Sequence, residues 1–301
     1  MSQKNLIVIV GPTAIGKTGL AIDIAQKLQT EIISCDSRQI YKEMLIGTAR
    51  PSEEQLSKIK HHFIASQSIH DYYNASIFEM SVMELLETLF QNHSYVVMTG
   101  GSGLYVDAVC NGIDDLPTID PGIREEVHNR FKTEGIESLR RELFKIDPEY
   151  CHTADLQNPK RIFKALEVFY MTGKPYSTLL SKTKKERPFR IIKIALNRDR
   201  QELYNTIDLR VDQMLENGLL EEARILYPFK QLNALNTVGY KEFFDYFDHA
   251  YSLEEAISLV KRNSRRYAKR QISWFQRDKD TEWFHPDELS EIESYIFNAC
   301  V

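Results

Sequence analysis

The first hundred residues alternate short apolar runs with two-faced helical segments. Residues Asn5–Val10 (NLIVIV) are almost entirely apolar, which is typical of a parallel strand buried on both faces. A glycine-rich turn follows, and residues 17–28 place apolar side chains at helical spacing. Residues 31–36 (EIISCD) predict a second strand. This order of strand, loop, helix and strand predicts a doubly wound α/β sheet.

The alternation is interrupted once in the middle of the chain. Residues 75–90 predict a helix, and residues 95–99 (YVVMT) predict a third buried strand that ends in a second glycine-rich turn. Helical, charge-rich sequence then runs to a strand pattern at Arg190–Leu196, and the chain from Asp199 onward has a helical pattern throughout. We therefore expect an α/β core formed by residues 1–113 and 190–301, with a helical insertion domain at residues 114–189.

Composition adds little about function. The 301 residues are 43% hydrophobic and 27% charged, which are ordinary values for a soluble globular protein. No run of about 18 apolar residues and no cleavable signal pattern is present, so we expect a cytoplasmic protein that does not bind membranes. The four cysteines show no disulfide or zinc spacing, so a structural metal is not expected; they are Cys35, Cys110, Cys151 and Cys300.

Charge is unevenly distributed, although the net charge is only −5. Between Lys261 and Arg277 there are seven basic residues and no acid. At about 100° per residue, all seven project into one half of a helix, while residues such as Val260, Tyr267, Ala268, Trp274 and Phe275 occupy the other. The absence of acidic i,i+4 partners favours an unpaired face that binds phosphate groups. The alternative is a surface helix whose charges are solvated or paired to acids elsewhere.

The first glycine-rich turn is a phosphate-binding loop. Its eight residues fit the pattern G-x-x-x-x-G-K-[ST] between a strand and a helix; they are Gly11, Pro12, Thr13, Ala14, Ile15, Gly16, Lys17 and Thr18. In such a loop the backbone amides and the helix N-terminus receive phosphate, Lys17 adds a charge, and the Thr18 hydroxyl can bind Mg²⁺. The fold class is therefore a P-loop NTPase-like parallel sheet core with an inserted, mainly helical domain. The loop predicts a di- or triphosphate ligand and no particular reaction.

Asp36 ends the second strand beside this loop. From its position it could bind Mg²⁺ in a nucleotide hydrolase, act as a general base, or cap the next segment. The residues after it, Ser37, Arg38 and Gln39, carry groups suited to holding a nucleobase by its edges, which shifts the balance toward a base-binding site.

Six blocks of sequence give the chain a resemblance to the tRNA dimethylallyltransferase family, in the family's order; they are GPTAIGKT, DSRQIYKEMLIGTARP, GGSGLYVDAVCNG, NPKRIFKALEVFYMTGKP, LNTVGYKE and RRYAKRQISWFQR. The bacterial form fits best, because the zinc finger of eukaryotic relatives is absent. The resemblance implies transfer of a dimethylallyl group from dimethylallyl diphosphate to the N6 amine of the adenosine immediately 3′ of the anticodon, in tRNAs that read codons beginning with U. It also implies that the insertion domain grips the anticodon stem-loop and that ATP is not the natural ligand. We expect a monomer.

The resemblance also implies roles for individual residues. Asp36 would be the general base, Ser102 a hydrogen-bonding group near the reacting amine, and Lys17 a catalytic cation. The phosphate loop with Arg210 would hold the diphosphate, with Mg²⁺ on Thr18. The expected tRNA-binding residues are Asp36, Ser37, Arg38, Gln39, Ser102, Arg124, Lys160, Arg161, Ile162, Phe163, Lys164, Arg265, Arg266 and Lys269.

The chain departs from the family pattern at two positions. Ser102 stands where threonine is usual, so the hydroxyl is kept. Thr206 stands where many members carry an arginine, so one expected cation near the diphosphate is missing; Arg210 in the next helical turn could partly replace it. We expect this missing cation to affect the affinity for the prenyl donor more than the type of reaction.

Two other classes of function compete with the transferase. An ATP-dependent nucleoside or small-molecule kinase could use the same loop, and would be indifferent to tRNA. A non-catalytic RNA-binding protein with a decayed phosphate loop is disfavoured by the intact Gly16, Lys17, Thr18 and Asp36.

Overall fold

The computed structural model describes residues 3–114, 116–181 and 183–299, so Cys300 lies outside the described residues. The described chain divides into two compact units, residues 1–111 with 186–301 and residues 112–185. The first unit is the sheet-containing core, and the described residues of the second form helices without a strand. Among the described residues, no helix is both long and apolar enough to cross a membrane.

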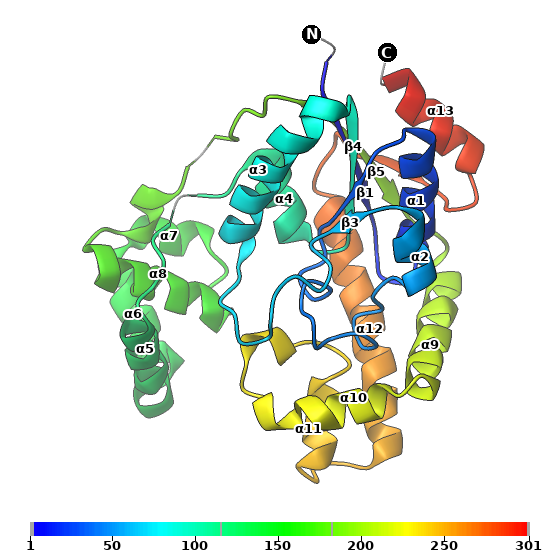
Figure 1. Ribbon diagram of the computed structural model, residues 1–301. Coiled ribbons are helices and arrows are strands. Elements are labelled where there is room, and N and C mark those ends of the chain that lie inside the picture. Colours follow the sequence, from blue (N-terminus) through cyan, green and yellow to red (C-terminus); the bar gives the residue numbers. More distant parts are fainter. Residues whose placement is uncertain (1–2, 115, 182, 300–301) are drawn as a thin grey trace. The chain divides into compact units, whose positions relative to one another are not determined.

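The core unit contains one six-stranded sheet (Figure 1). All pairs in the order β3-β2-β4-β1-β5-β6 are parallel. The strands are β1 (Asn5–Val10), β2 (Ile32–Ser34), β3 (His61–His62), β4 (Tyr95–Gly100), β5 (Arg190–Leu196) and β6 (Glu282–Phe284). The predicted α/β class is confirmed. Strands β3 and β6 were not expected, and the prediction of helix throughout the C-terminal part is wrong at β6.

Register places the functional loops at one edge of this sheet. Val10, the last residue of β1, pairs with Gly100 on one side and Ala195 on the other. Ser34 at the end of β2 pairs with Thr99. Because the strands are parallel, the loops that follow β1, β2 and β4 all leave from the same edge, which is where open α/β sheets bind ligands.

Helices surround the sheet and extend the core unit. They are α1 (Lys17–Lys27), α2 (Glu53–Lys58), α3 (Ala75–Asn92), α4 (Gly103–Asn111), α9 (Arg200–Glu216), α10 (Leu219–Leu226), η2 (Tyr227–Phe229), η3 (Asn233–Leu235), α11 (Lys241–Phe247), α12 (Leu253–Phe275) and α13 (Leu289–Ala299). Every residue of β1 is buried, which confirms the prediction of a strand covered on both faces. Burial of each large apolar side chain of this strand contributes roughly 1.5–3 kcal/mol.

The helix α12 joins two hydrophobic cores. Its Ala268 packs in the core around the sheet, with Ile7, Ile9 and Ile24. Its Val260 packs in a second core that α10 and α11 complete. Figure 1 shows α12 running from the sheet toward α11, beside α9. One helix therefore carries side chains to both ends of the site described below.

The second unit is a small helical domain with a core of its own. Its helices are α5 (Pro121–Glu134), α6 (Ile136–Ile146), α7 (Pro148–Thr153), α8 (Pro159–Thr172) and η1 (Tyr176–Leu179). Asp120, Asp147 and Asn158 cap α5, α7 and α8, each followed by proline at the first helical position. The unit ends at Lys185, four residues before the predicted boundary, because Arg187 bonds to Glu79 and the carbonyl of Val109 in the core unit.

Candidate active site

The loop between β1 and α1 has the backbone geometry of a phosphate cradle. Gly11 and Gly16 take φ angles of 148° and 98°, which side chains rarely adopt. A Cβ on Gly11 would lie 2.7 Å from the Leu196 carbonyl oxygen, so glycine is also needed for close packing on β5. Gly16 is the N-cap of α1, where the free amides and the helix dipole favour an anion. The predicted strand–loop–helix context is confirmed.

Two cations, Lys17 and Arg210, stand at this loop and line the same cavity. The Lys17 ammonium donates to the Pro12 carbonyl at 2.7 Å. Loss of solvent and the charge of Arg210 lower the pKa of Lys17 to about 8, against the opposing effect of Asp36. The Arg210 guanidinium donates to the Thr13 hydroxyl, and loss of solvent lowers its pKa to about 10. A bound anion would oppose both shifts, so the electrostatics of the loop favour an anionic ligand.

Asp36 uses one carboxylate oxygen for structure. Its Oδ1 accepts the backbone amides of Arg38 and Gln39, at 2.8 and 3.2 Å, and so fixes the turn after β2. Within the described residues Oδ2 has no hydrogen-bond donor. The capping and the functional interpretations are therefore compatible, since each requires a different oxygen.

The Ser102 hydroxyl forms two hydrogen bonds with Ser37. It accepts the Ser37 amide at 2.9 Å and donates to the Ser37 hydroxyl at 3.1 Å. Tyr267 of α12 lies beside this pair; burial and the charge of Asp36 raise its pKa to about 12, against a hydrogen bond with Ser102. Ser37 lines the larger of two cavities, whereas Ser102 lines neither. The hydroxyl that the structure presents at this point is therefore that of Ser37.

The two cavities meet at four shared residues. One cavity has a volume of about 430 Å³ and is lined by the phosphate loop from Thr13 to Thr18, by Gln39 and by Thr206 of α9. The other has a volume of about 650 Å³ and is lined by the turn after β2 and by residues of α9, α11 and α12. Both are lined by Thr13, Asp36, Thr48 and Arg210. We call these two spaces the diphosphate cavity and the acceptor cavity, after the ligands that the sequence leads us to expect.

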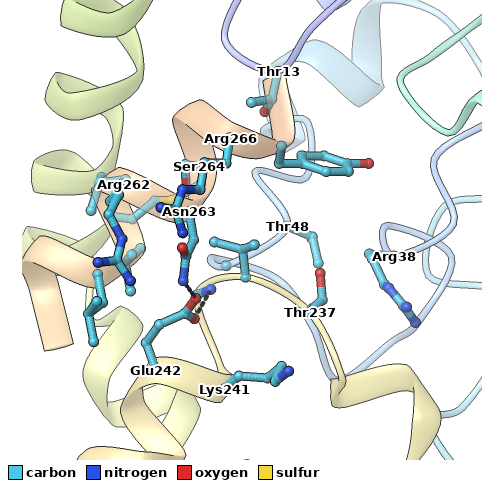
Figure 2. Close-up of a pocket in the computed structure, with 18 of the residues that line it drawn as sticks. Thr13, Arg38, Thr48, Thr237, Lys241, Glu242, Arg262, Asn263, Ser264 and Arg266 are labelled. Atoms are coloured by element: carbon cyan, nitrogen blue, oxygen red, sulfur yellow. Dashed lines mark hydrogen bonds between the residues drawn. The ribbon is translucent and has the colours of Figure 1, made fainter. Parts of the chain in front are cut away.

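The acceptor cavity is faced by cations from several elements. Arg262 and Arg266 of α12 face it from one side and Arg38 from the other (Figure 2). Glu242, also in this lining, is satisfied internally: it accepts the Gly239 amide at 2.9 Å and the Asn263 side chain at 2.7 Å. Among the interactions of the described residues, Glu242 therefore forms no ion pair with these arginines.

The donor set at the phosphate loop fits a divalent ion that is held mainly by a ligand's phosphates. Thr18 offers a hydroxyl to the diphosphate cavity, beside Ser34 and Asp36. Among the described residues, no group of three or more histidines, cysteines and acids could bind a metal without such a ligand. This pattern suits Mg²⁺, which takes one or two protein ligands together with phosphate oxygens.

The basic residues of α12 divide into groups with different surroundings. Arg265 pairs with Asp208 at 2.5 Å, and Lys261 pairs with Asp212 at 2.6 Å, both acids lying on α9. The expectation of an unpaired stripe is therefore wrong for these two, because the partners come from another helix. Arg262, Arg266 and Arg270 line the acceptor cavity, whereas Lys269 is exposed and lines neither cavity.

The predicted tRNA-binding residues of the insertion also divide. Lys160 and Arg161 are exposed on α8, and Lys164 is half-buried. The Nε atom of Arg124 lies 3.7 Å from Oε1 of the buried Glu167. Ile162 and Phe163 are 0% and 8% exposed and pack in the core of this unit, so a direct side-chain contact with tRNA is wrong for both. Their side chains stabilise the helix that carries the charges.

The sequence did not single out several residues that shape the site. Thr48 lines both cavities, and its backbone carbonyl accepts the Gln39 side chain at 3.1 Å. Lys241 lines the acceptor cavity, and Gln271 binds the phosphate loop. All three lie within the quoted sequence blocks, but a glutamine on a basic helix carries no signal of its own.

Comparison with known proteins agrees with this geometry. The family model described as IPP transferase matches residues 39–278. This chain belongs to that family. Curated relatives include tRNA dimethylallyltransferase 1 of Phocaeicola vulgatus, 53% identical over 98% of both chains, and tRNA dimethylallyltransferase 1 of Bacteroides fragilis, 52% identical over 98% of both.

Solved structures of the family share the fold over nearly the whole chain. The full-length tRNA isopentenylpyrophosphate transferase of Bacillus halodurans is 34% identical with a TM-score of 0.73, covering 99% of this chain and 97% of that one. A eukaryotic dimethylallyltransferase acting on tRNA is 25% identical with a TM-score of 0.78, covering 98% of this chain and 77% of that one. The P-loop-like core is therefore that of the family.

Proposed function

We propose that this chain is a tRNA dimethylallyltransferase. It transfers the dimethylallyl group of dimethylallyl diphosphate to the N6 amine of the adenosine immediately 3′ of the anticodon, in tRNAs that read codons beginning with U. The names of the relatives support the reaction class. The observation that carries the proposal is the junction of the two cavities, where Asp36 stands between the phosphate loop and a cation-lined space.

The chemistry requires charge stabilisation on the donor side. The allylic C–O bond breaks and the diphosphate leaves with its electron pair, so negative charge grows at the phosphate loop. Lys17, Arg210 and the loop amides would stabilise that charge, and the hydrogen bonds of Lys17 to Pro12 and of Arg210 to Thr13 support this role. We propose Mg²⁺ as the divalent ion, held by Thr18 and the diphosphate, where it would neutralise further charge.

On the acceptor side, the amine nitrogen forms the new N–C bond and must lose one proton. Its lone pair is delocalised into the adenine ring, so it is a weak nucleophile without a base. The free Oδ2 of Asp36 can accept the proton, while Oδ1 remains bound to the turn. The base must leave the RNA stack to reach this point, and a flipped nucleotide fits a concave space such as the acceptor cavity.

The insertion domain would hold the anticodon stem-loop through Lys160, Arg161, Lys164 and Arg124. Arg38, Gln39 and Arg266 would contact the acceptor nucleotide or its backbone. We also propose a cytoplasmic monomer.

Incubation with radiolabelled dimethylallyl diphosphate and bulk tRNA, with labelled ATP as the control, tests the function. We expect label in tRNA from the prenyl donor alone, with release of diphosphate. Phosphate transfer from ATP without tRNA would instead support the kinase, and binding of tRNA with no transfer would support a non-catalytic protein.

A further inference from the structure

Gln271 joins two loops that are far apart in the sequence. Its side chain, on α12, is 5% exposed. Its Oε1 accepts the backbone amide of Thr13 at 2.8 Å, and its Nε2 donates to the carbonyl of Gly101 at 2.9 Å. A single buried amide thus links the phosphate loop to the loop after β4.

In the proposed reaction, one of these loops binds the prenyl donor and the other lies next to the general base that serves the acceptor. Thr13 lies in the phosphate loop, and its hydroxyl also accepts the Arg210 guanidinium. Gly101 precedes Ser102, whose hydroxyl binds Ser37 next to Asp36. The Gln271 amide is therefore a direct connection between the donor-binding loop and the cluster that holds the general base.

Gly101 leaves just enough room for this connection. A Cβ on Gly101 would lie 2.1 Å from the Gln271 Nε2, whereas the next neighbours are at 3.4 and 3.5 Å. Gly101 does not have a left-handed backbone, so alanine is sterically allowed there apart from this one contact. A methyl group at Gly101 would displace the amide and leave the surrounding backbone in place.

We infer that Gln271 is a positioning residue for the transfer reaction, an inference that rests on the proposed function. It fixes the distance between the diphosphate loop and the Asp36–Ser37–Ser102 cluster, so that the allylic carbon meets the amine in line. Rate depends steeply on such placement: a displacement of about 1 Å can cost about 10²-fold. Gln271 lines neither cavity, so we expect it to act without touching substrate.

The first test replaces the amide with an apolar side chain of similar length, Gln271→Met. At saturating donor and tRNA we expect kcat to fall by roughly 10- to 100-fold, while the Kd of each substrate changes by less than about threefold. Gln276→Met is the matched control, because Gln276 is exposed at the end of the same helix. Circular dichroism and thermal melting confirm that each variant is folded at the assay temperature.

The second test reaches the same connection from the other loop. Gly101→Ala should lower kcat by a similar factor, and the double variant should be about as slow as either single variant, since both remove one link. Wild-type kcat in Gln271→Met, a loss confined to the KM of the donor, or multiplicative losses in the double variant would each overturn the inference. A wild-type chain without transfer activity would instead refute the proposed function.

Discussion

Asp36→Asn separates the two tasks of the Asp36 side chain. The asparagine Oδ1 can still accept the amides of Arg38 and Gln39, so the turn after β2 keeps its hydrogen bonds. Only the proton acceptor at Oδ2 is lost. We expect turnover to fall by at least about 10²-fold, which corresponds to a barrier about 2.7 kcal/mol higher, with tRNA and donor binding nearly unchanged.

Asp36→Ala provides the comparison, because it removes both tasks. Two lost hydrogen bonds at about 0.5–1.5 kcal/mol each predict about 1–3 kcal/mol of additional destabilisation. At roughly 2–4 °C per kcal/mol for a chain of this size class, the alanine variant should melt several degrees below the asparagine variant.

Single-turnover prenylation of a tRNA transcript, with excess enzyme and labelled donor, measures the chemical step in both variants. Filter binding of tRNA and differential scanning calorimetry supply the affinity and the melting temperature. A wild-type single-turnover rate in Asp36→Asn would refute the general-base assignment. Equal melting temperatures for the two variants would refute the structural role of Oδ1.

Two further predictions concern cations. Because the pKa of Lys17 is lowered to about 8 in the free protein, its proton is lost as pH rises through 8. The protonated fraction falls from about one half at pH 8 to about one tenth at pH 9, so the KM for dimethylallyl diphosphate should rise about fivefold over that interval. Lys17→Ala should abolish this dependence together with most of the affinity. Arg266→Gln should reduce the slope of log tRNA affinity against log salt by about one unit. Lys279→Gln serves as the control, because Lys279 is exposed in the turn after α12 and lines neither cavity. Equal slopes for the wild type and Arg266→Gln would remove Arg266 from the RNA contacts.

The elements that the sequence predicted correctly are those whose signal is local. The apolar run of β1, the glycine pattern and the helix α1 are all determined within about 25 residues, and the structure reproduces them. Strands β3 and β6 are two and three residues long, and too short to show a period. They form because the sheet edges beside β2 and β5 offer hydrogen bonds, which is a property of the assembled sheet.

The errors on α12 and α8 have different origins. The acids that pair with Lys261 and Arg265 lie on α9, some 50 residues away, so counting acids within the segment could not find them. Ile162 and Phe163 could have been assigned correctly from the sequence, because with Leu166 they form an apolar stripe at helical spacing. The block shared with the family indicates which helix is expected to approach RNA. The helical spacing of apolar residues within that block indicates which side chains are buried and therefore cannot contact RNA.

Sequence motifs reveal ligand-binding residues more readily than they reveal the residues that position those ligand-binding residues. Lys17 and Asp36 were found because their chemical types in those contexts have few other uses. Gln271, which was not predicted, and Arg210, which only the family resemblance supplied, act on the phosphate loop from positions about 200 to 260 residues away. Their hydrogen bonds are ones that many polar residues could make. Their placement depends on α9 and α12 packing beside the sheet edge. In this chain the phosphate loop is therefore held by side chains of α9 and α12, although only the loop carries a pattern that identifies a phosphate ligand.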